Sequence, residues 1–98
     1  MTIDTAIRHT TPTGGNVFAD LGFSPEEAAK LKIKAQLMCE ISEWIKENHL
    51  KQADAAKRLH VTRPRVSDVI TGKTDKFTID ALVDMLQHTG HQVTVKVA

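Results

Sequence analysis

The stretch LKQADAAKRLHVTRPRVSDVITGK, residues 50–73, decides the fold that this 98-residue chain is expected to adopt. From Gln52 to Leu59, alanine and leucine recur at helical spacing on one side, with basic residues on the other. A second helix begins at Thr62, a good N-cap whose hydroxyl can accept a free backbone N–H, and ends at Gly72. Its apolar stripe consists of Val66, Val69 and Ile70. The stretch therefore predicts two short helices joined by a tight turn.

The opposite side of the second helix is polar. At about 100° per residue, four positions point away from the apolar stripe: Pro64, Ser67, Asp68 and Thr71. Arg63 and Arg65 flank the stripe near the N-terminal end of the helix. Either arginine can bind the O6/N7 edge of guanine or a phosphate, and the sequence leaves open which of the two contacts a base. The pattern is that of a helix-turn-helix, whose second helix enters the major groove of DNA.

Further polar residues complete the predicted DNA-binding surface. Gln52 opens the first helix, where its amide can bind a phosphate together with the helix N-terminus. Lys73 and Lys76, just past the second helix, are expected phosphate contacts. Asp68 is awkward there because phosphates repel a carboxylate; it can accept from a cytosine amine or orient a neighbouring arginine. The candidate DNA-binding residues are therefore Gln52, Thr62, Arg63, Pro64, Arg65, Ser67, Asp68, Lys73 and Lys76.

The distribution of charge supports this surface, whereas the total charge does not. The chain carries a net charge of only +1. Residues 49–76, however, contain seven Lys or Arg and three acidic residues, a local charge of +4, and the rest of the chain carries −3. Positive charge is thus concentrated on the segment with the two short helices, as phosphate binding requires. The alternative is that these cations are only the solvated face of a small domain.

The composition is that of one globular domain in a reducing compartment. The chain is 41% hydrophobic and 26% charged, and no apolar run approaches the roughly 18 residues of a membrane span. A single cysteine, Cys39, excludes an internal disulfide. The N-terminus lacks the basic start and apolar stretch of a secretory signal. We therefore expect a bacterial cytoplasmic protein without membrane contacts.

Enzymatic and metal chemistry are not indicated. The five histidines are scattered, and neither a CxxC nor an HExxH pattern occurs. The chain also lacks a glycine-rich phosphate loop and a nucleophile elbow. We therefore expect no catalysis, no metal and no cofactor.

The N-terminal part predicts an arm, a short turn and a long helix. Residues 1–15 are expected to form a flexible arm, and residues 16–98 the domain. In residues 16–23, one-turn spacing predicts a helical turn that docks on the core through Val17, Phe18 and Leu21. Ser24 then caps a helix that runs to about Asn48, roughly 35 Å at 1.5 Å per residue. That length favours a partner contact along part of the helix.

The C-terminal part predicts a helix and a strand. Thr78 caps a helix that runs to about Thr89, and Gly90 ends it. Alternating polar and β-branched residues at 92–97 then predict a strand without a partner elsewhere in the chain. Because an unpaired strand exposes its backbone donors and acceptors, we expect it to pair with its copy in a homodimer. The alternative is a tail that extends into solvent. The expected dimerisation residues are Val93, Thr94, Val95, Lys96 and Val97.

Several segments together resemble a known family of regulators. QADAAKRLHVTRPRVSDVITGK resembles the helix-turn-helix of the XRE/Cro-C1 repressor class. NVFADLG, SPEEA, RVSDVITGK, DKFTIDALVDML and the valine-rich tail look like its subgroup of short bacterial regulators that includes HigA-like antitoxins. Two residues depart from the pattern: His60 stands where the class has glycine in the turn, and Lys51 replaces the usual Thr N-cap.

The resemblance implies a mainly α, five-helix repressor-like fold with one C-terminal strand that pairs across a homodimer. It also implies a sequence-specific repressor that binds a palindromic operator in double-stranded DNA. For the antitoxin members it implies neutralisation of a RelE-like mRNA-cleaving toxin encoded beside them. Two alternatives stay open: a plain dimeric XRE-family regulator without a toxin, and a protein-interaction module with vestigial DNA binding.

Overall fold

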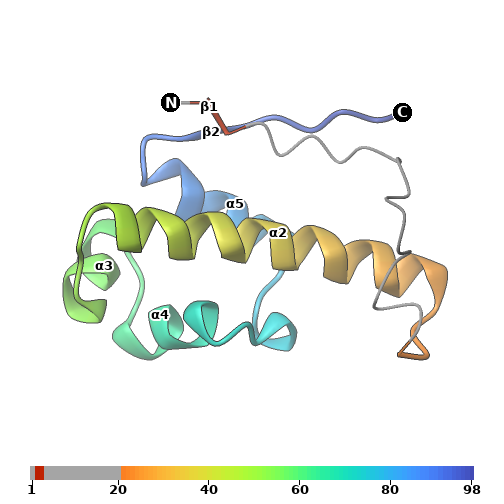
Figure 1. Cartoon of the computed structure of the whole chain (residues 1–98), viewed down its shortest axis with the longest axis horizontal. Helices are drawn as coiled ribbons and strands as arrows, with labels where there is room; N and C mark the ends of the chain where they lie inside the picture. Colours follow the sequence, from red (N-terminus) through yellow and green to blue (C-terminus); the bar gives the residue numbers. More distant parts are fainter. Residues whose placement is uncertain (1, 4–20) are drawn as a thin grey trace.

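A computed structural model describes residues 2–3 and 21–98 of the chain. Within these residues four α-helices, one 3-10 helix (η1) and two short strands are present (Figure 1). In chain order they are β1 (Thr2–Ile3), α2 (Pro25–Glu47), α3 (Gln52–Leu59), α4 (Arg63–Ile70), η1 (Thr74–Lys76), α5 (Ile79–Gln87) and β2 (Gln92–Val93). The described part is thus mainly helical, as predicted. Helices α3 and α4 lie on one side of α2, and the two strands lie on the other (Figure 1).

The long helix α2 begins and ends close to its predicted bounds. The Ser24 Oγ accepts a hydrogen bond from the Glu27 N–H at 3.2 Å, and Pro25 occupies the first turn, where a missing N–H costs little. At the other end, the Asn48 side-chain amide donates to the Trp44 carbonyl at 2.8 Å. None of the helices in residues 21–98 combines the length and apolar character needed to cross a membrane.

The hydrophobic core lies between the C-terminal half of α2 and the three shorter helices. Helix α2 packs mainly against α5 and α4, and α3 packs against α4. The core residues are Leu37, Met38, Ile41, Trp44, Ile45, Ala55, Ala56, Leu59, Val66, Val69, Phe77, Leu82, Met85 and Leu86. Full burial of one such aliphatic side chain contributes about 1.5–3 kcal/mol to folding. In the N-terminal half of α2, only Ala28 is buried.

One predicted core residue lies elsewhere. Ile70 was expected on the apolar stripe of α4, but its side chain is 43% exposed. Val66 and Val69 already occupy the side of α4 that faces the core. Ile70 is seven residues from Arg63 and therefore shares a flank of the helix with it rather than the buried side.

The turn between α3 and α4 is closed by a histidine in the left-handed conformation. His60 has φ 58° and ψ 39°, and the next N–H, of Val61, donates to the Ala56 carbonyl at 3.0 Å. Glycine is the usual residue here because it carries no Cβ. The expectation that a histidine is tolerated in this turn is confirmed. The His60 ring also lies 4.3 Å from the ring of His88, the C-cap of α5.

Helix α5 follows its predicted caps. The Thr78 Oγ1 accepts a hydrogen bond from the Ala81 N–H at 3.1 Å. The helix ends at Gln87, about two residues earlier than expected, and Gly90 follows with a positive φ of 83°. The helix buries Leu82, Met85 and Leu86.

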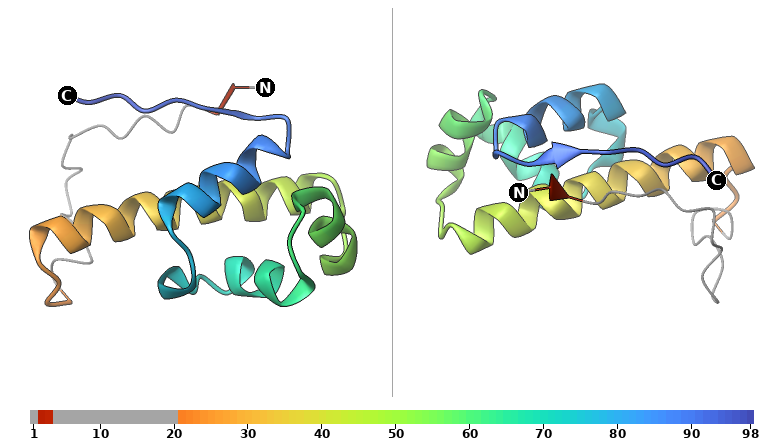
Figure 2. Two further views of the ribbon diagram at one scale, coloured as in Figure 1. Left: turned by 180° about the vertical axis from the view of Figure 1, so that it is seen from behind. Right: turned by 90° about the horizontal axis from the view of Figure 1, so that it is seen from above.

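The expectation of a C-terminal strand without a partner in the chain was wrong. Strand β2 covers only Gln92–Val93 and pairs in parallel with β1, with Thr2 opposite Gln92 and Ile3 opposite Val93. Two residues are too few to show an alternating pattern, so β1 gave no signal in the sequence. Residues 94–98 continue as a tail toward the N-terminal end of α2 (Figure 2).

Two predictions concern residues that are only partly described. Apart from β1, the expected flexible arm at 1–15 and its boundary with the domain lie outside the described residues. The same holds for most of the helical turn expected at 16–23. Of the three residues predicted to dock on the core, Leu21 is the one described; it is 69% exposed and does not dock as predicted.

Candidate nucleic-acid interface

The candidate interface is built on α4, whose buried side anchors it and whose opposite side carries polar residues. Val66 and Val69 hold the helix against α2 and α3, with at most 2% of either side chain exposed. Thr62, Arg63 and Pro64, at the start of α4, are all exposed. The structure therefore presents the N-terminal turn of α4 to solvent, as a helix that enters a DNA groove requires.

Thr62 caps α4 with its backbone and not with its side chain. Its carbonyl accepts hydrogen bonds from Arg65 at 3.1 Å and Val66 at 3.2 Å, whereas its hydroxyl makes no cap bond. The predicted side-chain cap was wrong for a local reason. An N-cap hydroxyl accepts from the second or third helical N–H. Here the second residue is Pro64, which has no N–H, and the third, Arg65, already donates to the Thr62 carbonyl. The Thr62 hydroxyl is left facing solvent.

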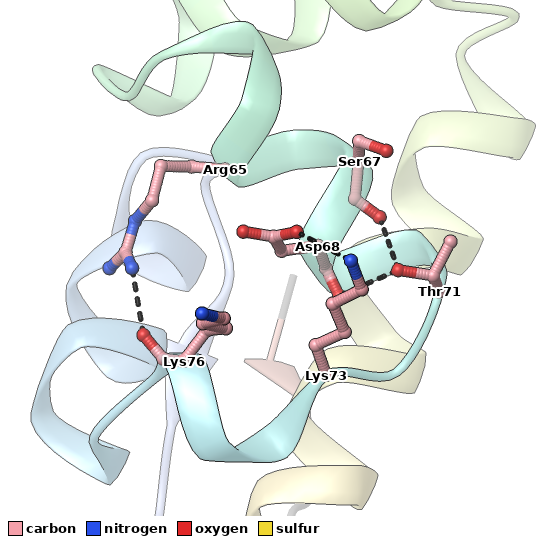
Figure 3. Close-up of polar contacts among 6 residues, drawn as sticks. All are labelled: Arg65, Ser67, Asp68, Thr71, Lys73 and Lys76. Carbon is pink, nitrogen blue, oxygen red and sulfur yellow. Dashed lines mark hydrogen bonds and ion pairs between the residues drawn. The ribbon is translucent and has the colours of Figure 1, made fainter.

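The two arginines of α4 have different surroundings. Arg63 is exposed, and its guanidinium forms no hydrogen bond, ion pair or ring contact with another described residue. Arg65 is half-buried: its Nη1 donates to the Lys76 carbonyl at 2.8 Å, and its Cζ lies 4.2 Å from the centre of the Phe77 ring. Figure 3 shows the Arg65 side chain directed from α4 to the backbone of Lys76. Sequence spacing alone did not distinguish these two side chains.

Asp68 forms an ion pair with a residue that was expected to bind phosphate. The Lys73 Nζ lies 3.6 Å from the Asp68 Oδ1, and the side chains are 55% and 23% exposed, respectively (Figure 3). Such a pair contributes at most about 1 kcal/mol. It does, however, place a cation beside the carboxylate, which reduces the repulsion that Asp68 would exert on a phosphate. The predicted neighbour was an arginine, and the structure has a lysine in that place.

Two hydroxyl residues, Ser67 in α4 and Thr71 at its C-cap, also differ. The Thr71 Oγ1 donates to the Ser67 carbonyl at 2.8 Å and lies 3.4 Å from the Asp68 carbonyl (Figure 3). This hydroxyl is therefore engaged with backbone carbonyls near the C-terminal end of α4. The hydroxyl of Ser67 makes no hydrogen bond to another described residue, and the residue is half-buried. Of the two, Ser67 is the one with a hydroxyl available to a ligand.

Side-chain hydrogen bonds and an ion pair attach the loop after α4 to the rest of the domain. Arg65 binds the Lys76 carbonyl, Lys73 pairs with Asp68, and the Lys34 Nζ of α2 lies 3.5 Å from the Thr74 carbonyl. The Lys76 side chain is exposed beside this attached backbone. Sequence reasoning missed Phe77 and Lys34 as residues that shape the interface. Lys34 and Thr74 are 40 residues apart, so no spacing pattern could have connected them.

The N-terminus of α3 is the second candidate phosphate site. Gln52 is the first residue of α3 and is half-buried. Lys51, the N-cap, makes no side-chain cap hydrogen bond, as expected for a departure from the usual threonine. Within the described residues, no group of three or more His, Cys, Asp or Glu is placed to hold a metal ion.

The expected dimerisation residues become more exposed along the tail. Val93 packs partly against the core, whereas Val95 is 63% and Val97 is 88% exposed. Thr94 is half-buried and Lys96 is exposed.

Comparison with known proteins assigns the chain to a family. No curated protein and no solved structure matches the chain at a significant level. A family model described as a helix-turn-helix domain matches residues 17–98, which include α2 to α5 and β2. The match supports a DNA-binding regulator. The chain belongs to this helix-turn-helix domain family.

Proposed function

We propose that this protein is a sequence-specific transcriptional repressor that binds a palindromic operator as a homodimer, and that it is the antitoxin of a toxin–antitoxin operon. The observation that carries the DNA-binding part is the exposed N-terminal turn of α4. Arg63 is exposed there and has no hydrogen bond or ion pair with another described residue, beside a Thr62 hydroxyl that makes no cap bond.

In this proposal, α4 contacts bases and its surroundings contact phosphates. Arg63 binds a guanine edge, with Thr62, Pro64 and Ser67 next to it in the groove. Gln52 binds a phosphate at the N-terminus of α3, and Lys73 and Lys76 bind phosphates from the loop after α4. Asp68 holds Lys73 in place and can accept from a cytosine amine.

The proposed dimer uses the C-terminal segment. A strand has two edges, and β1 occupies only one edge of β2. The other edge, with the tail residues Val93, Thr94, Val95, Lys96 and Val97, is proposed to pair with the same segment of a second copy. The exposed Val95 and Val97 would then be buried between the subunits. Two α4 helices related in this way contact half-sites about 34–36 Å apart.

The proposed toxin partner binds away from the DNA-binding helices. Ala28 is the one buried residue in the N-terminal half of α2, and Phe23, just before the helix, is 41% exposed. This half of α2 is therefore accessible for a protein partner of the RelE-like class that the resemblance implies.

The test of DNA binding is protection of a palindrome in the promoter region of the protein's own gene. Arg63→Ala is expected to weaken binding to that site by about 1–3 kcal/mol and to relax the preference for one base pair. Arg58→Ala, on the exposed face of α3, is the matched control for loss of one positive charge. Absence of any protected site would refute the repressor.

The antitoxin part is tested separately. Co-expression with the product of the adjacent gene is expected to restore growth that this product alone arrests. If the adjacent gene encodes no small basic toxin-like protein, the antitoxin role is refuted, and the proposed function becomes that of a dimeric regulator without a toxin.

A further inference from the structure

Arg63 and Arg65 are two residues apart on α4, and they lie on opposite flanks of it. At about 100° per residue, their side chains point roughly 200° apart around the helix axis. Arg63 is exposed with its guanidinium unpaired in the described structure, whereas Arg65 turns toward the loop that leads into α5. Their roles are therefore expected to differ, although both are arginines in the same turn.

Arg65 is held by two contacts that occupy its guanidinium. One face of the group lies over the Phe77 ring, 4.2 Å from its centre, and Phe77 itself is only 3% exposed. One of its N–H donors is bound to the Lys76 carbonyl at 2.8 Å. A guanine edge is read by two parallel N–H donors of a guanidinium that extends into the groove. Arg65 would have to leave both Phe77 and Lys76 to do so.

We propose that Arg65 is a positioning residue that clamps the first turn of α4 to Phe77 and to the backbone of Lys76, and that Arg63 is the arginine that reads a base. The inference rests on the proposed DNA binding. The clamp fixes the recognition helix relative to the loop that carries the Lys76 side chain. The Asp68–Lys73 pair ties the same loop to α4 nearer its C-terminal end. Arg65 thus acts on DNA through the position of α4 and Lys76.

The clamp can be tested because Phe77 is buried and cannot contact DNA itself. Phe77→Leu removes the ring under the guanidinium and keeps an apolar side chain in the core. A double-mutant cycle of Arg65→Ala and Phe77→Leu, read by thermal unfolding, measures the coupling of the two side chains. Arg65→Ala is expected to lower Tm by about 4–8 °C in the wild-type background and by much less when Phe77 is already leucine.

The same variants are then compared in operator binding at several salt concentrations. Arg65→Ala and Phe77→Leu are both expected to weaken binding and to change the slope of log K against log salt by the same amount, because both release the same clamp. Arg65→Lys, which keeps the charge but lacks the planar face, is expected to recover binding and Tm only in part. Arg63→Ala is expected to leave Tm unchanged and to weaken binding by about 5- to 100-fold with relaxed base preference. Leu86→Val, in the core on α5, is the control for general destabilisation and is expected to leave binding unchanged well below its Tm.

Three results would overturn the inference. The first is additive Tm effects of Arg65→Ala and Phe77→Leu. The second is a salt slope about 0.9 smaller for Arg65→Ala but unchanged for Phe77→Leu, which identifies a direct phosphate contact of Arg65. The third is unchanged operator binding by Phe77→Leu where Arg65→Ala binds weakly. If the wild-type protein binds no DNA, the proposed function fails, and the Tm cycle still decides whether the clamp exists.

Discussion

His60 and Lys51 flank α3, and neither side chain is the type that its backbone conformation favours. His60 has a positive φ of 58°, a conformation in which glycine carries no steric cost. Lys51 has the φ of −76° and ψ of 158° of an N-cap but provides no side-chain acceptor. Each mismatch lowers stability by about 1 kcal/mol or less. Both can therefore be corrected by substitution.

His60→Gly is expected to stabilise the domain by up to about 1 kcal/mol, because the strain in the left-handed turn is relieved. His60→Val is expected to destabilise it, since a β-branched residue is disfavoured at positive φ. Thermal unfolding of the three proteins should therefore rank Gly above His and His above Val. His88→Ala measures separately what the contact between the two histidine rings contributes. A lower Tm for His60→Gly than for the wild-type protein, with a similar loss for His88→Ala, would show that this contact outweighs the strain.

Lys51→Thr is expected to stabilise the domain by about 1 kcal/mol. Unlike the start of α4, the start of α3 has no proline, so the second and third helical N–H groups, of Ala53 and Asp54, can donate to a cap hydroxyl. Chemical denaturation checks the gain, and Lys51→Ala is the control that removes the same charge without adding a cap. Equal stability of the two variants would argue against a capping effect.

Among the secondary-structure elements, α2 is divided into two halves with different surroundings. Its C-terminal half contributes five residues to the hydrophobic core, whereas in its N-terminal half Leu31, Ile33 and Ala35 are only half-buried. The apolar stripe predicted along the whole helix is real, but its second half is buried in the core, whereas in the first half only Ala28 is buried and Ile33 packs partly against the core. The first half is helical because of its cap at Ser24 and its continuity with the packed half.

Ile41→Ala is expected to cost about 2–5 kcal/mol, because Ile41 is fully buried and its removal leaves a cavity. Leu31→Ala, ten residues earlier on the same helix, is expected to cost less than half as much. Urea unfolding of the two variants measures the difference. Similar losses would mean that the N-terminal half of α2 is packed as tightly as the C-terminal half.

For the molecule as a whole, the C-terminal segment is the proposed contact with a second subunit. Replacement of Val95 and Val97 by lysine is expected to leave the monomer folded, since both side chains are exposed in it. The same change would place charges in the proposed dimer interface, where they are not compensated. Light scattering after size exclusion should then report a monomer with unchanged helical circular dichroism. Persistence of a dimer would locate the interface elsewhere.

Most of the helices were predictable, and the particular errors have physical causes. The bounds of α3 and α4 follow from apolar spacing and from the stop signal at Gly72, both of which are local. The cap at Thr62 was misjudged because its acceptor role depends on which neighbouring N–H groups are free. Ile70 was wrongly predicted to lie on the buried stripe of α4, because its exposure depends on how far α2 and α3 extend around α4.

The helix-turn-helix and the candidate binding residues could be predicted from the sequence, because caps, glycines and helical periodicity act within a few residues of chain. Which of these residues are engaged within the protein depends on the packing of the helices. Arg65 is attached to the backbone 11 residues away, and β2 finds its partner strand at the opposite end of the chain. Such contacts depend on how the helices pack on α2, and that packing sums many weak interactions that no single spacing pattern records.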